Sequence, residues 1–86
     1  MLSTMLIVAN VCSVNCTVEL IDNEMVMFSL QNCAPCEKMK KTLDEYGIVY
    51  RTVDLQQYNR VNGIAHEILF APTIVRKQNG TVEILK

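Results

Sequence analysis

Residues Met25–Cys36 read MVMFSLQNCAPC, an apolar run followed by two cysteines that are separated by two residues. The run Met25–Leu30 is too short for a typical helix and predicts a buried strand. A segment with helical spacing follows the cysteines directly. Two cysteines one helical turn apart can come within disulfide distance. The stretch therefore predicts a strand, a redox-active dithiol and the start of a helix.

Cys33 is predicted to be the reactive thiol. The first N–H groups of a helix lack partners within the helix and carry a partial positive charge, which favours a negative sulfur at that end. The thiolate is the nucleophilic form of cysteine. Pro35 suits the first turn because its missing N–H is no loss there and its φ is already helical. We assign Cys33 as nucleophile and Cys36 as the more shielded thiol that resolves a mixed disulfide.

The chain after the dithiol continues with a helix and a second strand. Residues Pro35–Tyr46 are predicted to be helical because their apolar side chains recur at three- and four-residue spacing, and Gly47 supplies the stop. Residues Ile48–Leu55 alternate as a strand does. A strand, a helix and a strand joined by short links form a right-handed parallel crossover.

The second half predicts a shorter helix and a hairpin. Residues Asn59–Leu69 carry one apolar stripe at helical spacing, and Pro72 ends the segment. Thr73–Lys77 and Thr81–Leu85 are predicted strands. Asn79-Gly80 between them is a strong signal for a two-residue turn, so these strands are expected to be antiparallel neighbours.

The first 24 residues are predicted to be an N-terminal extension to the domain formed by residues 25–86. Thr4–Ala9 and Thr17–Ile21 are candidate extra strands within it. Residues Met5–Val14 are apolar, but no basic residue precedes them and the run is shorter than a membrane span. We therefore expect a cytoplasmic protein without a membrane partner; a cleaved signal is the less favoured alternative.

Length and charge restrict the function further. The chain has 86 residues, half of them apolar and one in five charged, which is typical of one small folded domain. Its net charge is −1 and no basic stripe is present, so no nucleic-acid partner is predicted. In a reducing cytosol, a CxxC pair is more often catalytic or metal-binding than a permanent crosslink.

The order of motifs resembles the thioredoxin fold, and specifically its glutaredoxin branch, from about Met25 to the end of the chain. The marks are the Cys33–Cys36 motif at the first strand–helix junction, Val53-Asp54-Leu55 at the end of the second strand, and Phe70–Val75, which reads FAPTIV. This resemblance implies an α/β fold with a central mixed four-stranded sheet, in the element order β-α-β-α-β-β.

The resemblance also implies how substrate is bound. It implies that the Ala71–Pro72 peptide bond is cis and faces the dithiol, where the preceding backbone pairs with an extended substrate. A simple break between helix and strand is the alternative for Pro72. The implied site comprises catalytic Cys33 and Cys36, substrate-binding Ala34, Pro35, Ala71, Pro72 and Thr73, and no metal.

Two departures from the resemblance stand out. We expect the usual C-terminal helix to be missing, because Gly80 stands alone in the predicted turn and no helical segment follows it up to Lys86. The lysine that commonly precedes the dithiol is also missing, which weakens the case for charge pairing with a glutathione carboxylate. Loss of the helix would uncover part of one sheet face. We expect the extension Met1–Leu20 to cover it, with self-association as the alternative.

The sequence therefore predicts a small glutaredoxin-like thiol–disulfide oxidoreductase without a bound cofactor, a monomer or weak dimer. The expected partners are disulfide-containing proteins, with a ribonucleotide reductase as one possible client. Glutathione or a thioredoxin-reductase-like flavoenzyme would supply electrons. The alternative is a thioredoxin-like binding module whose cysteines hold zinc or a structural disulfide and which does not turn over.

Cys12 and Cys16 have three interpretations. They can be small buried thiols, a regulatory disulfide, or part of a four-sulfur zinc site with the CxxC pair. The zinc interpretation is the weakest, because a ligand set that used Cys33 would remove the nucleophile.

Overall fold

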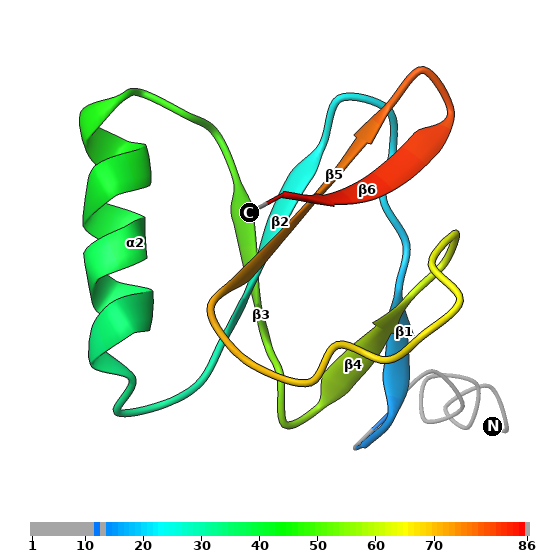
Figure 1. The fold of residues 1–86 in the computed structure, drawn as a ribbon, viewed down its shortest axis with the longest axis horizontal. Coiled ribbons are helices and arrows are strands. Elements are labelled where there is room, and N and C mark those ends of the chain that lie inside the picture. Colours follow the sequence, from blue (N-terminus) through cyan, green and yellow to red (C-terminus); the bar gives the residue numbers. More distant parts are fainter. Residues whose placement is uncertain (1–11, 13, 86) are drawn as a thin grey trace, which may run out of the picture.

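The computed structural model of the chain describes residue 12 and residues 14–85, which form three layers (Figure 1). One helix, α2, covers one face of a four-stranded sheet, and a pair of short strands packs against the other face. The elements in chain order are β1 (Cys16–Val18), β2 (Met25–Ser29), α2 (Ala34–Glu45), β3 (Arg51–Asp54), β4 (Tyr58–Val61), β5 (Thr73–Gln78) and β6 (Thr81–Leu85).

The four-stranded sheet has the order β3-β2-β5-β6 and is mixed. Strands β2 and β3 are parallel and are joined through α2, whereas β5 is antiparallel to both β2 and β6. The β5–β6 turn contains Asn79 and Gly80, both with positive φ, as a two-residue hairpin turn requires. The predicted α/β class with a mixed four-stranded sheet is therefore confirmed.

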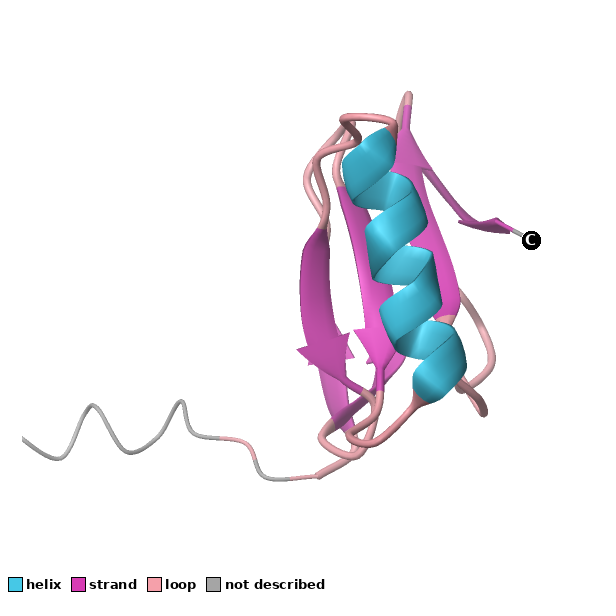
Figure 2. Ribbon diagram, turned by 90° about the vertical axis from the view of Figure 1, so that its left-hand side faces the viewer, coloured by secondary structure: helices cyan, strands magenta, loops and turns pink. Residues whose placement is uncertain are grey.

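Successive side chains of β2 point to opposite faces of the sheet and are buried on both. Val26 and Phe28 are fully buried in a core cluster with Val75 of β5. Met27 is also fully buried, and strand geometry turns it to the opposite face. Figure 2, viewed from the α2 side, shows the helix lying along this second face, to which it contributes buried Cys36 and Leu43.

The helix predicted over Asn59–Leu69 is wrong. The structure has a short strand, β4, which pairs in parallel with β1, and turns and bends follow it up to β5. The apolar stripe was real, since Val61 and Ile68 are buried, but they reach the core from a strand and an irregular segment. Tyr58 and Val61 favour a strand, and Gly63 at φ +105° cannot continue a helix.

Other boundaries shifted by a few residues. The strand predicted over Ile48–Leu55 begins only at Arg51, and the strand predicted over Thr17–Ile21 runs from Cys16 to Val18. The candidate strand Thr4–Ala9 lies outside the described residues. Within the described part of the predicted extension, Val18 and Leu20 join the core cluster, so this part covers the sheet face opposite α2.

No helix follows β6 within residues 14–85, where α2 is the single helix. Among these residues no helix is both long and apolar enough to cross a membrane.

Gly63 occupies a position that requires glycine on two grounds. Its φ of +105° is unfavourable for residues with a side chain, and an added Cβ would lie 3.0 Å from Cγ2 of Val82. Gly47, after α2, also has a positive φ (+69°), but its added Cβ would meet nothing within 4 Å. A comparison of Gly63 with Gly47 therefore separates the cost of a positive φ from the cost of a close contact.

We predict that Gly63→Ala lowers the free energy of unfolding by about 2 kcal/mol or more, since it adds overpacking to an unfavourable φ. Gly47→Ala is the matched control and should lower it by about 1 kcal/mol through φ alone. Urea denaturation of the two variants measures the difference. Equal losses would contradict a tight contact between Gly63 and Val82.

Candidate active site

Cys33 caps the N-terminus of α2. Its backbone is extended, with φ −109° and ψ 102°, and the helix begins at the next residue with Pro35 in its first turn. The chain reaches this point from β2 through a tight turn in which Asn32 adopts φ +54°. Asparagine tolerates this left-handed conformation better than most residues. The local sequence thus ends β2 and starts α2 within a few residues.

The two sulfurs of the CxxC motif are joined. Cys33 and Cys36 form a disulfide with a Cα–Cα distance of 5.2 Å. The Cys36 N–H donates a hydrogen bond to Cys33 Sγ at 3.1 Å. One of the unpaired N–H groups of the helix therefore points at the Cys33 sulfur, as the sequence predicts. Such a donor stabilises negative charge on that atom.

The two cysteines differ in exposure. Cys33 is half-buried, whereas Cys36 is fully buried at the interface between α2 and the sheet. Ala34 and Pro35 between them are exposed. Glu37 is the one acidic residue of the first helical turn, and its carboxylate pairs with Lys40 Nζ at 3.3 Å, which offsets the negative charge nearest the sulfur. A reagent in solvent can approach Cys33 and the loop, but not Cys36.

The segment around Pro72 lies at the end of the sheet where β2 leads into the dithiol. The Ala71–Pro72 peptide bond is cis. Strand β5 pairs with β2 so that Thr73 lies opposite Phe28, which puts Ala71 and Pro72 beside the end of β2 that leads to Cys33. Both are half-buried. The predicted site residues from the two halves of the chain are therefore brought to one edge of the sheet.

Thr73, which the resemblance implies to be a substrate-binding residue, is the first residue of β5. It is buried, and its hydroxyl donates a hydrogen bond of 2.5 Å to the Phe70 carbonyl. Its backbone is engaged in β5. Its side chain therefore holds the turn before β5.

Leu69, which was predicted to lie in a helix, and Phe70, which was not predicted to belong to the site, both lie beside Pro72. Leu69 and Phe70 are 76% and 71% exposed. With Pro72 they line a largely apolar cavity of about 550 Å³, which also borders Ile84 and Leu85. Leu69 was assigned to the buried stripe of a helix. No local signal opposed that prediction, because the restriction that a proline imposes acts on the residue directly before it, which is Ala71.

A polar cavity of about 310 Å³ lies between the loop that precedes the dithiol, α2 and the end of β3. The residues that line it include Gln31 and Asn32 of the loop, Glu37 and Lys40 of α2, and Asp54 at the end of β3. It therefore carries charges of both signs, in contrast to the apolar cavity next to Pro72. The two cavities therefore differ in the chemistry that they offer a ligand.

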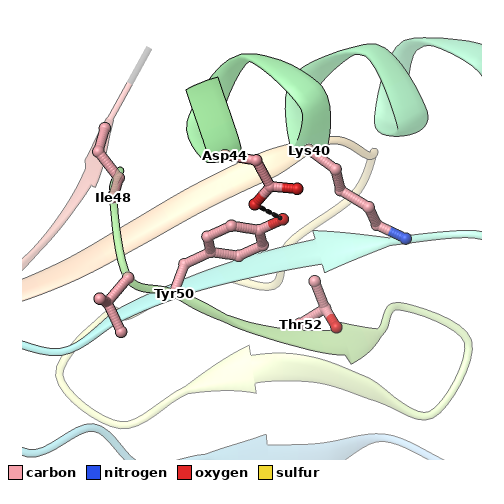
Figure 3. Close-up of a pocket in the computed structure, with 6 residues that line it drawn as sticks. Lys40, Asp44, Ile48, Tyr50 and Thr52 are labelled. Atoms are coloured by element: carbon pink, nitrogen blue, oxygen red, sulfur yellow. Dashed lines mark hydrogen bonds between the residues drawn. The ribbon is translucent and has the colours of Figure 1, made fainter. Parts of the chain in front are cut away.

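A third hollow of about 430 Å³ lies between α2 and the start of β3 (Figure 3). The Tyr50 side chain points into it toward Asp44, and its hydroxyl donates a 3.3 Å hydrogen bond to Asp44 Oδ1. Partial burial raises the pKa of Tyr50 above 10.0, and the nearby Asp44 and Glu37 carboxylates raise it further. Lys40 and Thr52 are shared between this hollow and the polar cavity.

Cys12 and Cys16 form a second disulfide, with a Cα–Cα distance of 6.1 Å. Each cysteine pair is closed on itself, so the four sulfurs do not form one ligand set. Among the residues that the structure describes, no three histidine, cysteine or acidic side chains are grouped to hold a metal.

The family model that matches the chain is described as Glutaredoxin, and the match covers residues 25–73. This is more than half of the chain, and it includes both the CxxC motif and Pro72. The chain belongs to the glutaredoxin family. No curated protein and no solved structure gives a significant match.

Membership of the glutaredoxin family indicates a function of the thiol–disulfide oxidoreductase kind. The matched range begins with the first residue of β2 and ends with the first residue of β5. Three features of the chain fall outside it: the Cys12–Cys16 disulfide, strand β1 and most of the β5–β6 hairpin.

We predict that Tyr50 ionises at a higher pH than a free tyrosine, because its phenolate would be partly desolvated and close to Asp44. Its pKa is raised in the folded state, so the stability it contributes is present below pH 10.0 and is lost at higher pH. Tyrosinate absorbance measures this. Tyr50→Phe should remove the component that titrates above the pH range of free tyrosine, and Asp44→Asn should move this component to lower pH. A Tyr50→Phe titration that keeps this component would contradict the assignment.

Proposed function

We propose that the chain reduces disulfides of proteins through the Cys33–Cys36 dithiol. The observation that carries the proposal is the hydrogen bond from the Cys36 N–H to Cys33 Sγ at the start of α2. A thiolate at this position gains a charge-assisted donor and the positive end of the helix dipole. The half-buried sulfur is accessible to a disulfide, and its partner is shielded.

The reaction has two steps. The Cys33 thiolate attacks one sulfur of the substrate disulfide, the substrate S–S bond breaks, and the second substrate sulfur leaves with the electron pair and takes a proton. The Cys36 thiol then loses its proton and attacks Cys33 Sγ, which releases the first substrate sulfur as a thiol. The substrate has gained two electrons, and the chain ends with the Cys33–Cys36 disulfide.

The order in which the two cysteines react follows from the burial of Cys36. Cys36 is fully buried and cannot meet a bulky substrate, but its Cα lies 5.2 Å from that of Cys33, within the range for an intramolecular disulfide. The shielded thiol therefore reacts only after the mixed disulfide has formed on its neighbour. The Ala71–Pro72 segment, at the same edge of the sheet, is proposed to hold the substrate backbone beside Cys33.

Surface chemistry favours a protein substrate. Leu69 and Phe70 expose large apolar side chains next to Pro72, where a polypeptide can bury them. The electron donor is proposed to be glutathione or a thioredoxin-reductase-like flavoenzyme, in a cytoplasmic setting and without a bound cofactor. Reduction assays that supply either glutathione with its reductase or the flavoenzyme identify the donor.

We predict that Cys33→Ser abolishes disulfide reduction, because no other sulfur at the site faces solvent. Cys36→Ser should keep the first step and accumulate a mixed disulfide with the substrate, since the resolving thiol is gone. Insulin reduction and non-reducing electrophoresis measure the two steps. Because serine at the buried position can disturb folding, Cys36→Ala is the second variant, and circular dichroism verifies its fold.

The matched control is the Cys12→Ser/Cys16→Ser variant, which should reduce insulin at the rate of the unchanged chain. Loss of the first step in both Cys33→Ser and a folded Cys36 variant would contradict the roles given to the two residues. Stoichiometric zinc in the purified protein, with Cys33 unreactive toward alkylation, would replace the enzyme proposal by the binding-module alternative.

We predict that Phe70→Ser raises the KM for a protein disulfide about ten-fold or less and leaves the kcat for a small disulfide unchanged, because only a polypeptide buries the Phe70 ring. Ile21→Ser is the control, since Ile21 is 74% exposed and precedes β2 at the opposite end of the sheet. Steady-state kinetics with insulin and with hydroxyethyl disulfide separate the effects. An equal KM change in both variants would show that the Phe70 effect is not local to the site.

A further inference from the structure

The Cys12–Cys16 disulfide closes a very short ring just before β1. Only three residues separate its cysteines. In the chain-entropy account, a disulfide stabilises a fold by closing a loop of the unfolded chain, and the gain falls as the loop shortens. A ring of this size therefore constrains the unfolded chain much less than a long-range crosslink would. A large contribution to global stability is a poor explanation of this pair.

The two sulfurs of the ring differ in their access to solvent. Cys16 lies in β1 and is 5% exposed, whereas Cys12 is half-exposed. A thiol from solution can therefore reach the Cys12 side of the bond more readily than the Cys16 side. This asymmetry between an accessible and a shielded sulfur also exists at Cys33 and Cys36. Exposed disulfides are the ones that exchange with thiols most readily.

Hydrogen bonds attach the ring to the turn that precedes β4. The Cys16 N–H donates to the Gln57 carbonyl at 2.9 Å, and Gln57 Nε2 donates to the Cys12 carbonyl. Asn59 Nδ2 donates to Asn15 Oδ1 at 2.9 Å, and Asn15 sits within the ring at φ +55°. The ring thus presents three polar groups in fixed positions to residues 57–59.

The ring also borders the layer that covers one face of the central sheet. β1 pairs only with β4 in the described residues, and the two strands bring Val18 and Val61 to the core. An isolated pair of short strands is marginally stable by itself. A covalent ring at the first residue of β1 therefore adds local order where the layer depends on a few hydrogen bonds.

We propose that Cys12 and Cys16 are a second redox site, which exchanges with thiols through Cys12 and whose oxidation fastens the start of β1 to β4. A thiolate of the reductant attacks Cys12 Sγ, the Cys12–Cys16 bond breaks, and Cys16 leaves with the electron pair and takes a proton. A second thiolate then attacks the sulfur bound to Cys12. Cys12 leaves and is protonated, and the reductant departs as a disulfide. The chain has gained two electrons, which the reductant has lost.

The reductant is a thiol of either of two sources: a small thiol such as glutathione, or the Cys33–Cys36 dithiol of a second copy. The proposal itself does not depend on the activity of the Cys33–Cys36 pair. It is therefore tested in the Cys33→Ser/Cys36→Ser variant, in which Cys12 and Cys16 are the only cysteines. A failure of the first dithiol would leave the result of this test unchanged.

The variant is equilibrated in mixtures of reduced and oxidised glutathione, quenched by alkylation and analysed by mass spectrometry, with circular dichroism to verify folding. We expect the folded protein to pass reversibly from disulfide to dithiol across the series. A disulfide that resists every mixture until the protein unfolds would overturn the proposal, as would two thiols that never join. Reduced Cys12→Ser/Cys16→Ser protein, used in place of glutathione, identifies whether a second copy can act as donor.

Variants with a single cysteine test which of the two sulfurs exchanges with a thiol from solution. In the background that lacks Cys33 and Cys36, Cys16→Ser keeps the accessible Cys12, and Cys12→Ser keeps the shielded Cys16. Oxidised glutathione should modify Cys12 in the first variant at least about ten-fold faster than Cys16 in the second. Equal rates, or a faster reaction at Cys16, would overturn the assignment of Cys12 as the point of exchange.

Amide hydrogen exchange tests the effect on β1. Reduction in the Cys33→Ser/Cys36→Ser variant should speed exchange of the Cys16 amide about five-fold or more, because its bond to the Gln57 carbonyl loses the support of the ring. The Asn23 amide, bonded to the Lys77 carbonyl, is the control and should keep its rate. An unchanged Cys16 rate would overturn the fastening of β1.

Discussion

The antiparallel pairing of β2 with β5 is the interaction on which the rest of the molecule depends. Its register sets Thr73 opposite Phe28, so the residues that enter β5 lie beside those that leave β2. The first of these are Ala71 and Pro72, and the second lead to Cys33. Residues almost forty positions apart in the sequence thereby meet at one edge of the sheet. The same two strands contribute Val26, Phe28 and Val75 to the core.

Features encoded by neighbouring residues could be predicted from the sequence. The apolar run of β2, the start of α2 at the dithiol and the Asn79-Gly80 turn each depend on a few consecutive residues, and the structure contains all three. The burial difference between Cys33 and Cys36 also follows from local geometry, because a helix that packs on a sheet turns the second cysteine inward. The sequence could predict the local geometry of the candidate site for this reason.

Features decided by distant partners could not be predicted. The segment Asn59–Leu69 has helical spacing, but its first residues pair with β1, which lies some forty residues earlier. Hydrogen bonds to such a partner leave no trace in the local periodicity. The exposure of Leu69 and Phe70 was missed for the same cause, since an irregular segment has no repeating buried face. The match to the glutaredoxin family covers residues 25–73, so it includes β4 but not its partner β1.

The sulfur of Cys33 is both the proposed reacting atom and the acceptor that caps α2. Helix caps contribute about 1 kcal/mol to stability, and a charged acceptor contributes more than a neutral one. Ionisation of the sulfur and order in the first turn of the helix are therefore thermodynamically linked. A well-ordered first turn holds the thiolate ready for reaction, and a covalent adduct on the sulfur weakens the cap. The proposed reaction alternates this sulfur between a disulfide and a thiolate, and it therefore links the strength of the helix cap to the redox state of the pair.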